Sequence, residues 1–205
     1  MKAFTKETAM AAVIPGENVD TDQIIPARFL KMDRAQGYGQ FMFHDQRFDK
    51  DGKEIADFVL NREPFRHAKI LVTDENFGCG SSREGAVYAM VDYGIRAVIG
   101  PSFGDIFYNN ALKNGMIPVR LPAGQVDVLR CQIENGPVRD ITIDLENSRV
   151  DLPDGTQAPI EIDPFWRECL LRGVDEIELT MGYLPQIEAF EKDYLSQMRW
   201  ITTQA

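Results

Sequence analysis

Residues 76–84 read Asn-Phe-Gly-Cys-Gly-Ser-Ser-Arg-Glu and bring two hydroxyl groups and a guanidinium together behind two glycines. An apolar run at 70–72 precedes this segment and a run with helical periodicity follows it, which predicts a strand, a loop and a helix in that order. The first N–H groups of a helix have no acceptor within the helix and attract anions. An arginine beside them can bind a carboxylate through two charge-assisted hydrogen bonds. The segment therefore indicates that Ser81, Ser82 and Arg83 grip a small di- or tricarboxylate.

The same residues could also move a proton. A serine oxygen surrounded by backbone N–H groups at the positive end of a helix dipole becomes an alkoxide at lower cost. Ser81 is therefore our candidate for a general base that removes a proton from a carbon next to a carboxylate. Ser81 and Glu84 also match a capping box, a structural role at the helix start that is compatible with the catalytic one. Cys79 has no histidine placed as its partner, and we interpret it as a structural residue.

Other chemistries lack their signatures. The sequence has no Gly-x-Ser-x-Gly elbow of a hydrolase and no phosphate loop ending in Gly-Lys-Ser/Thr. Its three cysteines (79, 131 and 169) and two histidines are widely spaced, which excludes a disulfide framework and a usual zinc or iron–sulfur site made by this chain alone. The acids at positions 20 and 22 are typical of a turn. A magnesium-binding carboxylate pair is the alternative, without an evident third ligand.

The composition is that of an ordinary globular protein. Its 205 residues are 44% hydrophobic and 26% charged, which fits one domain over 1–205. The net charge is −10 and no run of Lys and Arg is present, so nucleic acid is an unsuitable partner. No apolar run approaches the ~20 residues of a membrane span, and the N-terminus lacks the apolar centre of a signal peptide. We therefore expect a cytoplasmic protein.

The hydrophobic pattern predicts a mixed α/β domain with a barrel-like or layered sheet. Strands at 70–72 and 97–99 with a helix at 82–93 between them form a βαβ unit, whose strands should be parallel. The proline in a further strand at 116–119 indicates an edge position or a strand end. Residues 33–66 are irregular, which in a compact domain more often marks a functional segment. The remaining expected elements are a strand at 11–14, helices at 103–113, 124–134 and 164–171, an antiparallel meander at 141–145, 149–152 and 158–162, and a C-terminal helical tail over about 185–205, most regular at 185–199.

Segment 76–84 resembles the signature of the small subunits of 3-isopropylmalate dehydratase, the separate-chain counterparts of the aconitase swivel domain. The similarity covers most of the chain and includes segments 18–26, 28–30, 57–61, 92–94 and 101–107 in the order of the family. The resemblance implies a swivelling β/β/α fold. It also implies a partner, a large subunit with a 4Fe–4S cluster whose open iron binds the hydroxyl of a small 2-hydroxy diacid. The reaction would dehydrate 2-isopropylmalate and rehydrate it to 3-isopropylmalate in leucine biosynthesis.

The resemblance also assigns residues. Ser81 matches the catalytic base of aconitase, Arg83 matches a ligand of the substrate carboxylate, and Ser82 should assist. In this superfamily the loop after Ile-Ile-Pro selects the substrate side chain. Arg28 and Leu30 lie in that loop, and Leu30 is the candidate for packing on an isopropyl group. Arg47 falls where related enzymes place a second carboxylate-binding arginine, and a surface role is the alternative.

One position departs from the family pattern. The family usually has histidine after Ser-Ser-Arg-Glu, whereas this chain has Gly85. Two alternatives therefore stay open at this point. The chain could belong to a related hydratase that acts on another 2-hydroxy diacid, such as citraconate/2-methylmalate, or it could be a non-catalytic anion-binding module of the same fold.

Overall fold

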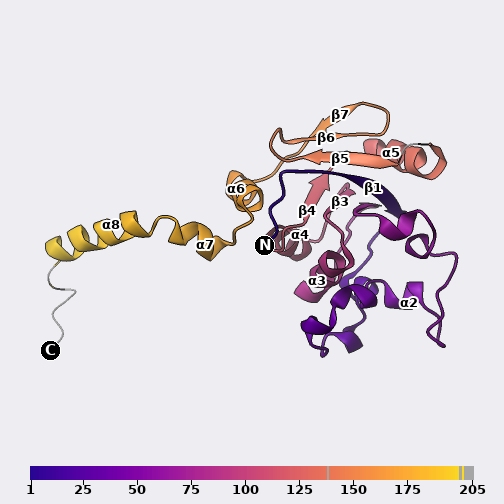
Figure 1. Ribbon diagram of the computed structural model, residues 1–205, viewed down its shortest axis with the longest axis horizontal. Coiled ribbons are helices and arrows are strands. Elements are labelled where there is room, and N and C mark those ends of the chain that lie inside the picture. The colour runs from indigo at the N-terminus through magenta and orange to yellow at the C-terminus, as the bar shows by residue number, and fades with distance from the viewer. Residues whose placement is uncertain (138, 199, 201–205) are drawn as a thin grey trace.

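A mixed sheet of seven strands organises the molecule (Figure 1). The structure is a computed structural model that describes residues 1–137, 139–198 and 200. Strands β1 to β4 run parallel, and β5 to β7 form an antiparallel meander on the other side of β1. The parallel unit and the meander were both expected from the sequence and are confirmed. In the spatial order β4-β3-β2-β1-β5-β6-β7, the strands are Ile117–Arg120, Ala97–Gly100, Ile70–Thr73, Lys6–Ile14, Asp140–Asp144, Arg149–Asp151 and Gln157–Pro159.

Alternating side chains divide the interior into two cores, one on each face of the sheet. In β1, Ala12 and Ile14 point to one core whereas Ala11 and Val13 point to the other. The alternation follows from the two-residue period of a strand. Because both faces are covered, the parallel strands are continuously apolar, as the run at 70–72 is. Pro118 lies in β4, which is an edge strand as expected, and there its missing N–H leaves no pairing unsatisfied.

Different helices cover the two faces of the sheet (Figure 1). Helix α3 (Glu84–Tyr93) packs on the first core together with the 27–67 region, while α5 (Ala123–Asn135) and α6 (Pro164–Arg172) pack on the second. Helix α4 (Asp105–Lys113) contributes to both. The irregular 33–66 region consists of short turns, as expected. The short helices are α1 (Thr21–Ile24), α2 (His44–Arg47), η1 (Ala27–Phe29), η2 (Arg34–Gln36), η3 (Tyr38–Phe41), η4 (Val59–Asn61) and η5 (Phe65–His67).

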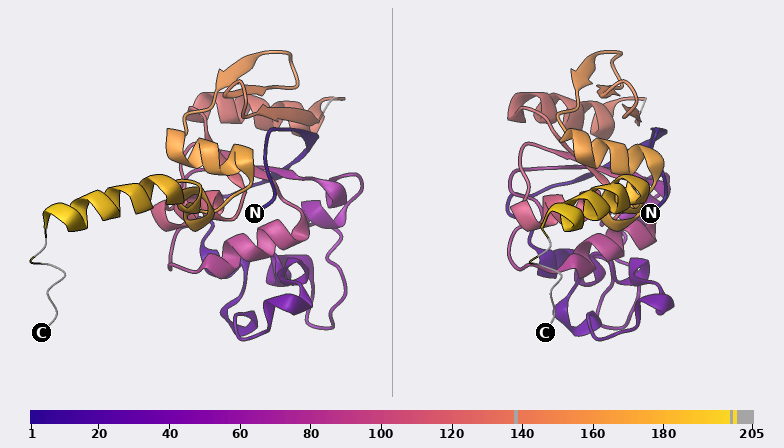
Figure 2. Two further views of the ribbon diagram at one scale, coloured as in Figure 1. Left: turned by 60° about the vertical axis from the view of Figure 1, so that its left-hand side comes forward. Right: turned by 90° about the vertical axis from the view of Figure 1, so that its left-hand side faces the viewer.

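The chain after α6 leaves the body of the molecule (Figures 1 and 2). Helix α6 begins at the expected proline behind Asp163, whose carboxylate accepts from Phe165 N at 2.8 Å, and ends at Gly173 in a left-handed conformation. Helix α7 (Glu176–Met181) is not expected from the sequence. Helix α8 (Leu184–Gln197) confirms the C-terminal helix, while residues 199 and 201–205 of that prediction lie outside the described residues. None of the described helices is both long enough and apolar enough to span a bilayer.

Candidate active site

Three segments that are distant in the sequence meet at the loop after β2. Gly78 N donates to Val19 O at 2.7 Å, and Thr21 N donates to Cys79 O at 2.9 Å. On the other side, Asn76 N donates to Ser102 Oγ at 2.8 Å, and Gly104 N donates to Phe77 O at 2.9 Å. The loop is therefore bonded through its backbone to segments 18–21 and 102–104, which stabilises one loop conformation.

Glycine is required at two places in this junction. A Cβ on Gly78 would lie 2.3 Å from the Phe107 ring, and a Cβ on Gly104 would lie 2.6 Å from Gly78 O. Gly78 also has a φ of 73°, a left-handed value that other residues adopt at a cost. These two glycines let the loop pack directly on α4.

The Ser81 side chain lies beside a buried threonine. Thr21 is 2% exposed, and its hydroxyl oxygen lies 3.2 Å from Ser81 Oγ and 3.3 Å from Ser81 O, to which it donates. Ser81 itself is exposed, so a substrate can approach its oxygen. When Thr21 donates to Ser81 O, the Ser81 hydroxyl can donate to Thr21 Oγ1. Rotation of the Thr21 hydroxyl would instead point its proton at Ser81 Oγ, which is the arrangement that an alkoxide needs.

The capping-box interpretation of Ser81 and Glu84 is wrong. Helix α3 begins at Glu84 rather than at residue 82, its N-cap is Arg83, and no side chain caps it. A turn closed by Arg83 N and Ser81 O at 2.8 Å holds the serine outside the helix. The Glu84 carboxylate instead accepts from Asn114 Nδ2 at 2.9 Å, at the end of α4. The long-range contact with Thr21 decides the position of Ser81, and a local pattern cannot report it.

Several hydrogen-bond donors at the start of α3 have no acceptor among the described residues. In the described structure, the backbone N–H groups of Ser82, Glu84 and Gly85 have no hydrogen-bond acceptor, and neither does the exposed Ser82 hydroxyl. Arg83 is 30% exposed and forms an ion pair with Asp22, whose side chain is 53% exposed. A guanidinium and several N–H groups without acceptors therefore lie within residues 82–85, a combination that suits a carboxylate.

Leu30 lies against the first turn of α3, at Gly85. A Cβ built on Gly85 would lie 2.5 Å from Leu30 Cδ2, so the absence of a side chain at position 85 makes room for Leu30. The loop is held from its other side by Tyr38, whose hydroxyl donates to Leu30 O at 3.3 Å and Met32 O at 2.8 Å. The glycine that departs from the family pattern at position 85 therefore leaves the space that the Leu30 side chain occupies.

Arg28 points to another partner. Its Nη1 donates to Asp45 Oδ2 at 2.8 Å, and its Nη2 lies 3.4 Å from His44 Nδ1, both on α2. The hydrogen bonds from Arg28 lower the pKa of the Asp45 carboxyl to about 2. Both side chains of this ion pair are more than half exposed. The guanidinium of Arg28 is therefore accessible, but its described contacts join it to α2 and not to Ser81 or Arg83.

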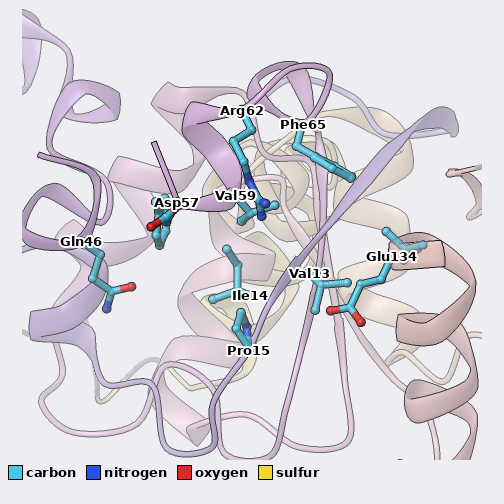
Figure 3. Close-up of a pocket in the computed structure, with 11 residues that line it drawn as sticks. Val13, Ile14, Pro15, Gln46, Asp57, Val59, Arg62, Phe65 and Glu134 are labelled. Atoms are coloured by element: carbon cyan, nitrogen blue, oxygen red, sulfur yellow. The ribbon is translucent and has the colours of Figure 1, made fainter. Parts of the chain in front are cut away.

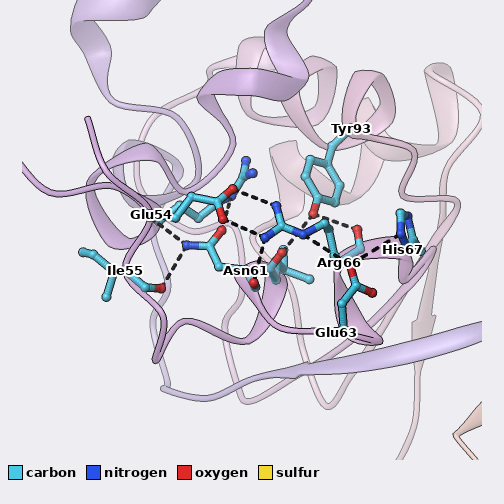
Figure 4. Close-up of polar contacts among 9 residues, drawn as sticks. Glu54, Ile55, Asn61, Glu63, Arg66, His67 and Tyr93 are labelled. Carbon is cyan, nitrogen blue, oxygen red and sulfur yellow. Dashed lines mark hydrogen bonds and ion pairs between the residues drawn. The ribbon is translucent and has the colours of Figure 1, made fainter. Parts of the chain in front are cut away.

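Arg47 is not a surface residue, so that alternative is wrong. It is 6% exposed, and its guanidinium donates to Met42 O at 3.2 Å and to Asn61 Oδ1 at 3.3 Å. Asn61 returns a bond to Arg47 O at 2.6 Å. Figure 4 shows the surrounding network, in which Arg66 bonds both oxygens of Glu54. This burial favours a structural role for Arg47, and its predicted contact with a substrate carboxylate stays a prediction.

The described residues offer no metal centre. No group of three or more His, Cys, Asp or Glu side chains that could hold a metal occurs among them. Cys79 lies in the loop, Cys131 is exposed on α5, and Cys169 is buried on α6, so these thiols do not form a cluster site. Asp20 caps α1 by accepting from Gln23 N at 2.8 Å, and Asp22 pairs with Arg83. Asp20 therefore has the local backbone contact expected of a turn residue. The described residues provide no third ligand for the alternative, a magnesium site at Asp20 and Asp22.

A separate cavity of about 470 Å³ lies between the end of β1, the η4 region and α5 (Figure 3). Val13 and Val59 contribute to its apolar wall, and Arg62 and Glu134 are among its charged lining residues. None of the predicted site residues lines it in the described structure. The candidate site at the start of α3 is therefore separate from this cavity.

Two residues of the site were not predicted from the sequence as partners of the central loop. Thr21 and Asp22 follow the acid that was interpreted as a turn residue, and their contacts with Ser81 and Arg83 span about 60 positions of the chain. A local pattern carries no signal for such contacts. The one available signal was that segment 18–26 belongs to the resemblance.

The chain has relatives among known proteins. A family model described as the aconitase C-terminal domain matches residues 1–124. A curated relative from Gluconobacter oxydans is 52% identical over 93% of this chain and 92% of its own length, and its name is "3-isopropylmalate dehydratase small subunit". Two further relatives have the same name. The one from Dinoroseobacter shibae is 48% identical over 98% of this chain and 100% of its own length. The one from Granulibacter bethesdensis is 52% identical over 98% of this chain and 96% of its own length.

A solved structure is similar as well. The crystal structure titled 3-isopropylmalate dehydratase from Methanocaldococcus jannaschii superposes with a TM-score of 0.62 at 29% identity. The match covers 99% of that chain but 90% of this one. The shared part thus accounts for the whole archaeal chain, and about a tenth of the present chain lies beyond it.

Proposed function

The chain belongs to the family of 3-isopropylmalate dehydratase small subunits, which share the aconitase C-terminal domain, and from this premise we propose how its residues act in the reaction. The function is that of the small subunit of the leucine-biosynthetic hydro-lyase that interconverts 2-isopropylmalate and 3-isopropylmalate. The swivel-domain fold expected from the sequence is confirmed. The observation that carries the proposal is the convergence of Ser81, Thr21 and Arg83 at the open start of α3.

Ser81 is the proposed base. As an alkoxide, its oxygen takes the proton from the carbon adjacent to the hydroxyl-bearing carbon, the electron pair of that C–H bond forms the double bond, and the hydroxyl leaves the neighbouring carbon as hydroxide. In the second half-reaction hydroxide adds to the carbon that lost the proton, and Ser81 returns its proton to the other carbon, which regenerates the alkoxide. Thr21, at 3.2 Å, donates to the Ser81 oxygen while it is negatively charged.

Arg83 and the free N–H groups of α3 bind a carboxylate of the substrate. The guanidinium is held at the surface by Asp22 before the substrate arrives, so its side-chain entropy is partly lost in advance. Ser82 adds a hydroxyl donor beside it. This arrangement holds the reacting carbon close to Ser81, which is the positional part of the rate enhancement.

Leu30 forms an apolar wall for the alkyl group. It lies against the first turn of α3 because Gly85 leaves room for it and Tyr38 holds its backbone. An apolar wall distinguishes alkyl groups that differ by one or two methylenes by about 1–3 kcal/mol. Arg28 remains a proposed second contact for the diacid, reached from the α2 side of the same loop.

A large subunit completes the site. The relatives' names identify them as small subunits, and the cysteines described in this chain do not fit a 4Fe–4S cluster. We infer that the large subunit holds that cluster, which supplies a Lewis acid for the substrate hydroxyl. The steps assigned to this chain remain proton transfer, carboxylate binding and recognition of the alkyl group.

The test is an anaerobic assay of this chain reconstituted with its large subunit. Dehydration produces an alkene conjugated with carboxylates, which is followed by ultraviolet absorbance. In the assembled complex Ser81→Ala should lower kcat by about 10²–10⁴-fold, whereas Ser196→Ala, an exposed serine of α8, should not change it. Size-exclusion chromatography verifies that both variants assemble. Wild-type turnover by assembled Ser81→Ala would refute the role of Ser81, and a wild-type complex that consumes citraconate but no isopropylmalate would refute the substrate.

A further inference from the structure

The C-terminal arm, which we define as residues 176–198 with helices α7 and α8, exposes most of the chain's large exposed apolar side chains. Ile177 is 73% exposed and Phe190 is 67% exposed, although side chains of this size are normally buried. The body of the molecule has few such side chains on its surface. A concentration of this kind on one projecting segment marks an interaction surface.

Helix α7 attaches the C-terminal arm to the body of the molecule. Helix α7 begins with a capping box formed by Asp175 and Glu178. Leu179 is 4% exposed, and Glu176 forms an ion pair with Lys113 of α4 at 3.6 Å. Helix α8 then projects away from the body, as both views agree (Figures 1 and 2). None of its described residues is buried.

Helix α8 is amphipathic. Leu184, Ile187, Phe190, Tyr194 and Met198 follow one another at steps of three or four residues and form one stripe, with the Phe190 and Tyr194 rings stacked at 5.7 Å. The opposite face carries Ala189, Lys192 and Ser196. Fourteen residues give a helix about 21 Å long. This is the pattern of a helix that lays its apolar face into a groove.

The exposed stripe needs a partner on energetic grounds. A helix of about 12–15 residues without tertiary packing is marginal in water. Full burial of an exposed large apolar side chain stabilises by about 1.5–3 kcal/mol. The five side chains of the stripe are already partly covered, so their remaining burial could supply on the order of 5 kcal/mol of gross stabilisation. That amount offsets part of the cost of bringing two proteins together.

We propose that this arm docks into an apolar groove of the large subunit, a proposal that rests on the two-subunit function given above. The Dinoroseobacter relative aligns over 201 of the 205 residues and over its full length. An alignment that omits so few residues includes the arm, so the arm is shared with a protein whose name states that it is a small subunit.

A second copy of this chain is the less suitable occupant. Helix α8 carries Glu188, Glu191 and Asp193 against one Lys192, and the whole chain carries −10. Pairing two copies would bring like charges together. The groove that fits the arm is apolar with Lys or Arg at its rim.

The test compares two neighbouring substitutions in the full-length chain. Phe190→Asp places a charge in the stripe, whereas Ala189→Asp places the same charge on the opposite face of the same helix. We expect Phe190→Asp to raise the Kd for the large subunit by at least thirtyfold, as for a central aromatic anchor. Ala189→Asp should change the Kd by less than threefold. Circular dichroism and isothermal titration calorimetry report helix content and affinity.

Each outcome decides the proposal. Equal affinities of the wild type and Phe190→Asp overturn it, and so does equal weakening by both variants, because a general loss of α8 would then explain the effect. A homodimer of the isolated chain that Phe190→Asp dissociates assigns the stripe to a second copy instead. Turnover of 2-isopropylmalate by the wild-type complex is measured in parallel. Active wild type with unaffected Phe190→Asp overturns the docking proposal alone, and an assembled but inactive wild type overturns the function alone.

Discussion

Replacement of Gly85 by alanine should displace the Leu30 side chain from its position at the start of α3. The new Cβ would lie 2.5 Å from Leu30 Cδ2, while its contact with Tyr38 Cε2, at 3.7 Å, is ordinary. Carbon atoms pack best at about 3.5–4.0 Å, so Leu30 must move by about 1 Å or more. Tyr38 restrains the Leu30 backbone through its hydroxyl, so the shift is taken up by rotation of the Leu30 side chain, of which Cδ2 is the flexible end.

Two opposing terms set the magnitude. Alanine is favoured over glycine inside a helix by about 1 kcal/mol, and overpacking costs about 1–3 kcal/mol. We expect a net loss of about 0–2 kcal/mol in the free energy of unfolding. Because Leu30 is the proposed wall for the alkyl group, its displacement should also raise KM for 2-isopropylmalate by about 5–30-fold, equivalent to about 1–2 kcal/mol.

A matched glycine and a double-mutant cycle isolate the contact. Gly124 is also the second residue of its helix, and a Cβ there meets nothing within 4 Å. Gly124→Ala should therefore stabilise the chain by about 0.5–1 kcal/mol and leave KM unchanged. In a Leu30→Ala background the clash is absent, so Gly85→Ala should become stabilising. The coupling free energy between positions 30 and 85, from urea denaturation, should be about 1–3 kcal/mol.

The reasoning is refuted if Gly85→Ala behaves like Gly124→Ala in the wild-type background. A stabilised chain with an unchanged KM would mean that Leu30 rotates away at no cost and that its seat is irrelevant to the substrate. A coupling free energy of zero between positions 30 and 85 in the double-mutant cycle would likewise show that the contact with Leu30 carries no cost. A higher KM with no coupling to Leu30 would place the effect elsewhere in the first turn of α3.

Three further predictions concern the charged side chains. Arg47→Ala should lower the free energy of unfolding by about 2–4 kcal/mol, because it leaves buried acceptors unpaired, whereas the exposed Arg62→Ala should change it by less than about 0.5 kcal/mol in the same denaturation experiment. Asp22→Asn should leave stability within about 0.5 kcal/mol, since its ion pair is exposed, and should raise KM about fivefold because Arg83 loses its orientation; an unchanged KM would show that this orientation is unimportant. The Asp45 pKa is lowered from 3.8 to about 2 by its arginine partner, so its contribution to stability is complete above pH 4 and is lost as the pH falls toward 2. Asp45→Asn should therefore flatten the melting temperature between pH 4 and pH 2 relative to wild type, and identical pH profiles would count against the ion pair.

Local sequence signals predicted most of the fold because each has a short-range physical cause. The apolar run at 70–72 predicted a strand buried on both faces, and Gly94 and Gly173 adopt the left-handed conformation that ends a helix. Pro118 predicted an edge strand through its missing N–H. Helix α7 was missed because its six residues carry too little periodicity for a pattern to emerge.

Some features of the candidate site could likewise be predicted from local sequence, and others could not. Its residue types and its place between a strand and a helix follow from segment 76–84, because glycines, hydroxyls and an arginine at a helix start have a chemistry of their own. The sequence also excluded a metal site within the chain as an expectation, through the spacing of its cysteines. It did not reveal that Arg47 is buried, since burial depends on how the 33–66 region folds back on α3.

The sequence by itself therefore determined the order of the elements, the family and the kind of group that the central loop can bind, because these depend on neighbouring residues and on motifs. Only the tertiary structure decided that Thr21 bonds Ser81, that Asp22 holds Arg83, and that Leu30 rests on Gly85. Each of these contacts joins residues about 55–60 positions apart, and their distances are set by packing across the sheet rather than by local preference. Only the tertiary structure, too, shows that α8 projects from the body with its apolar stripe facing solvent.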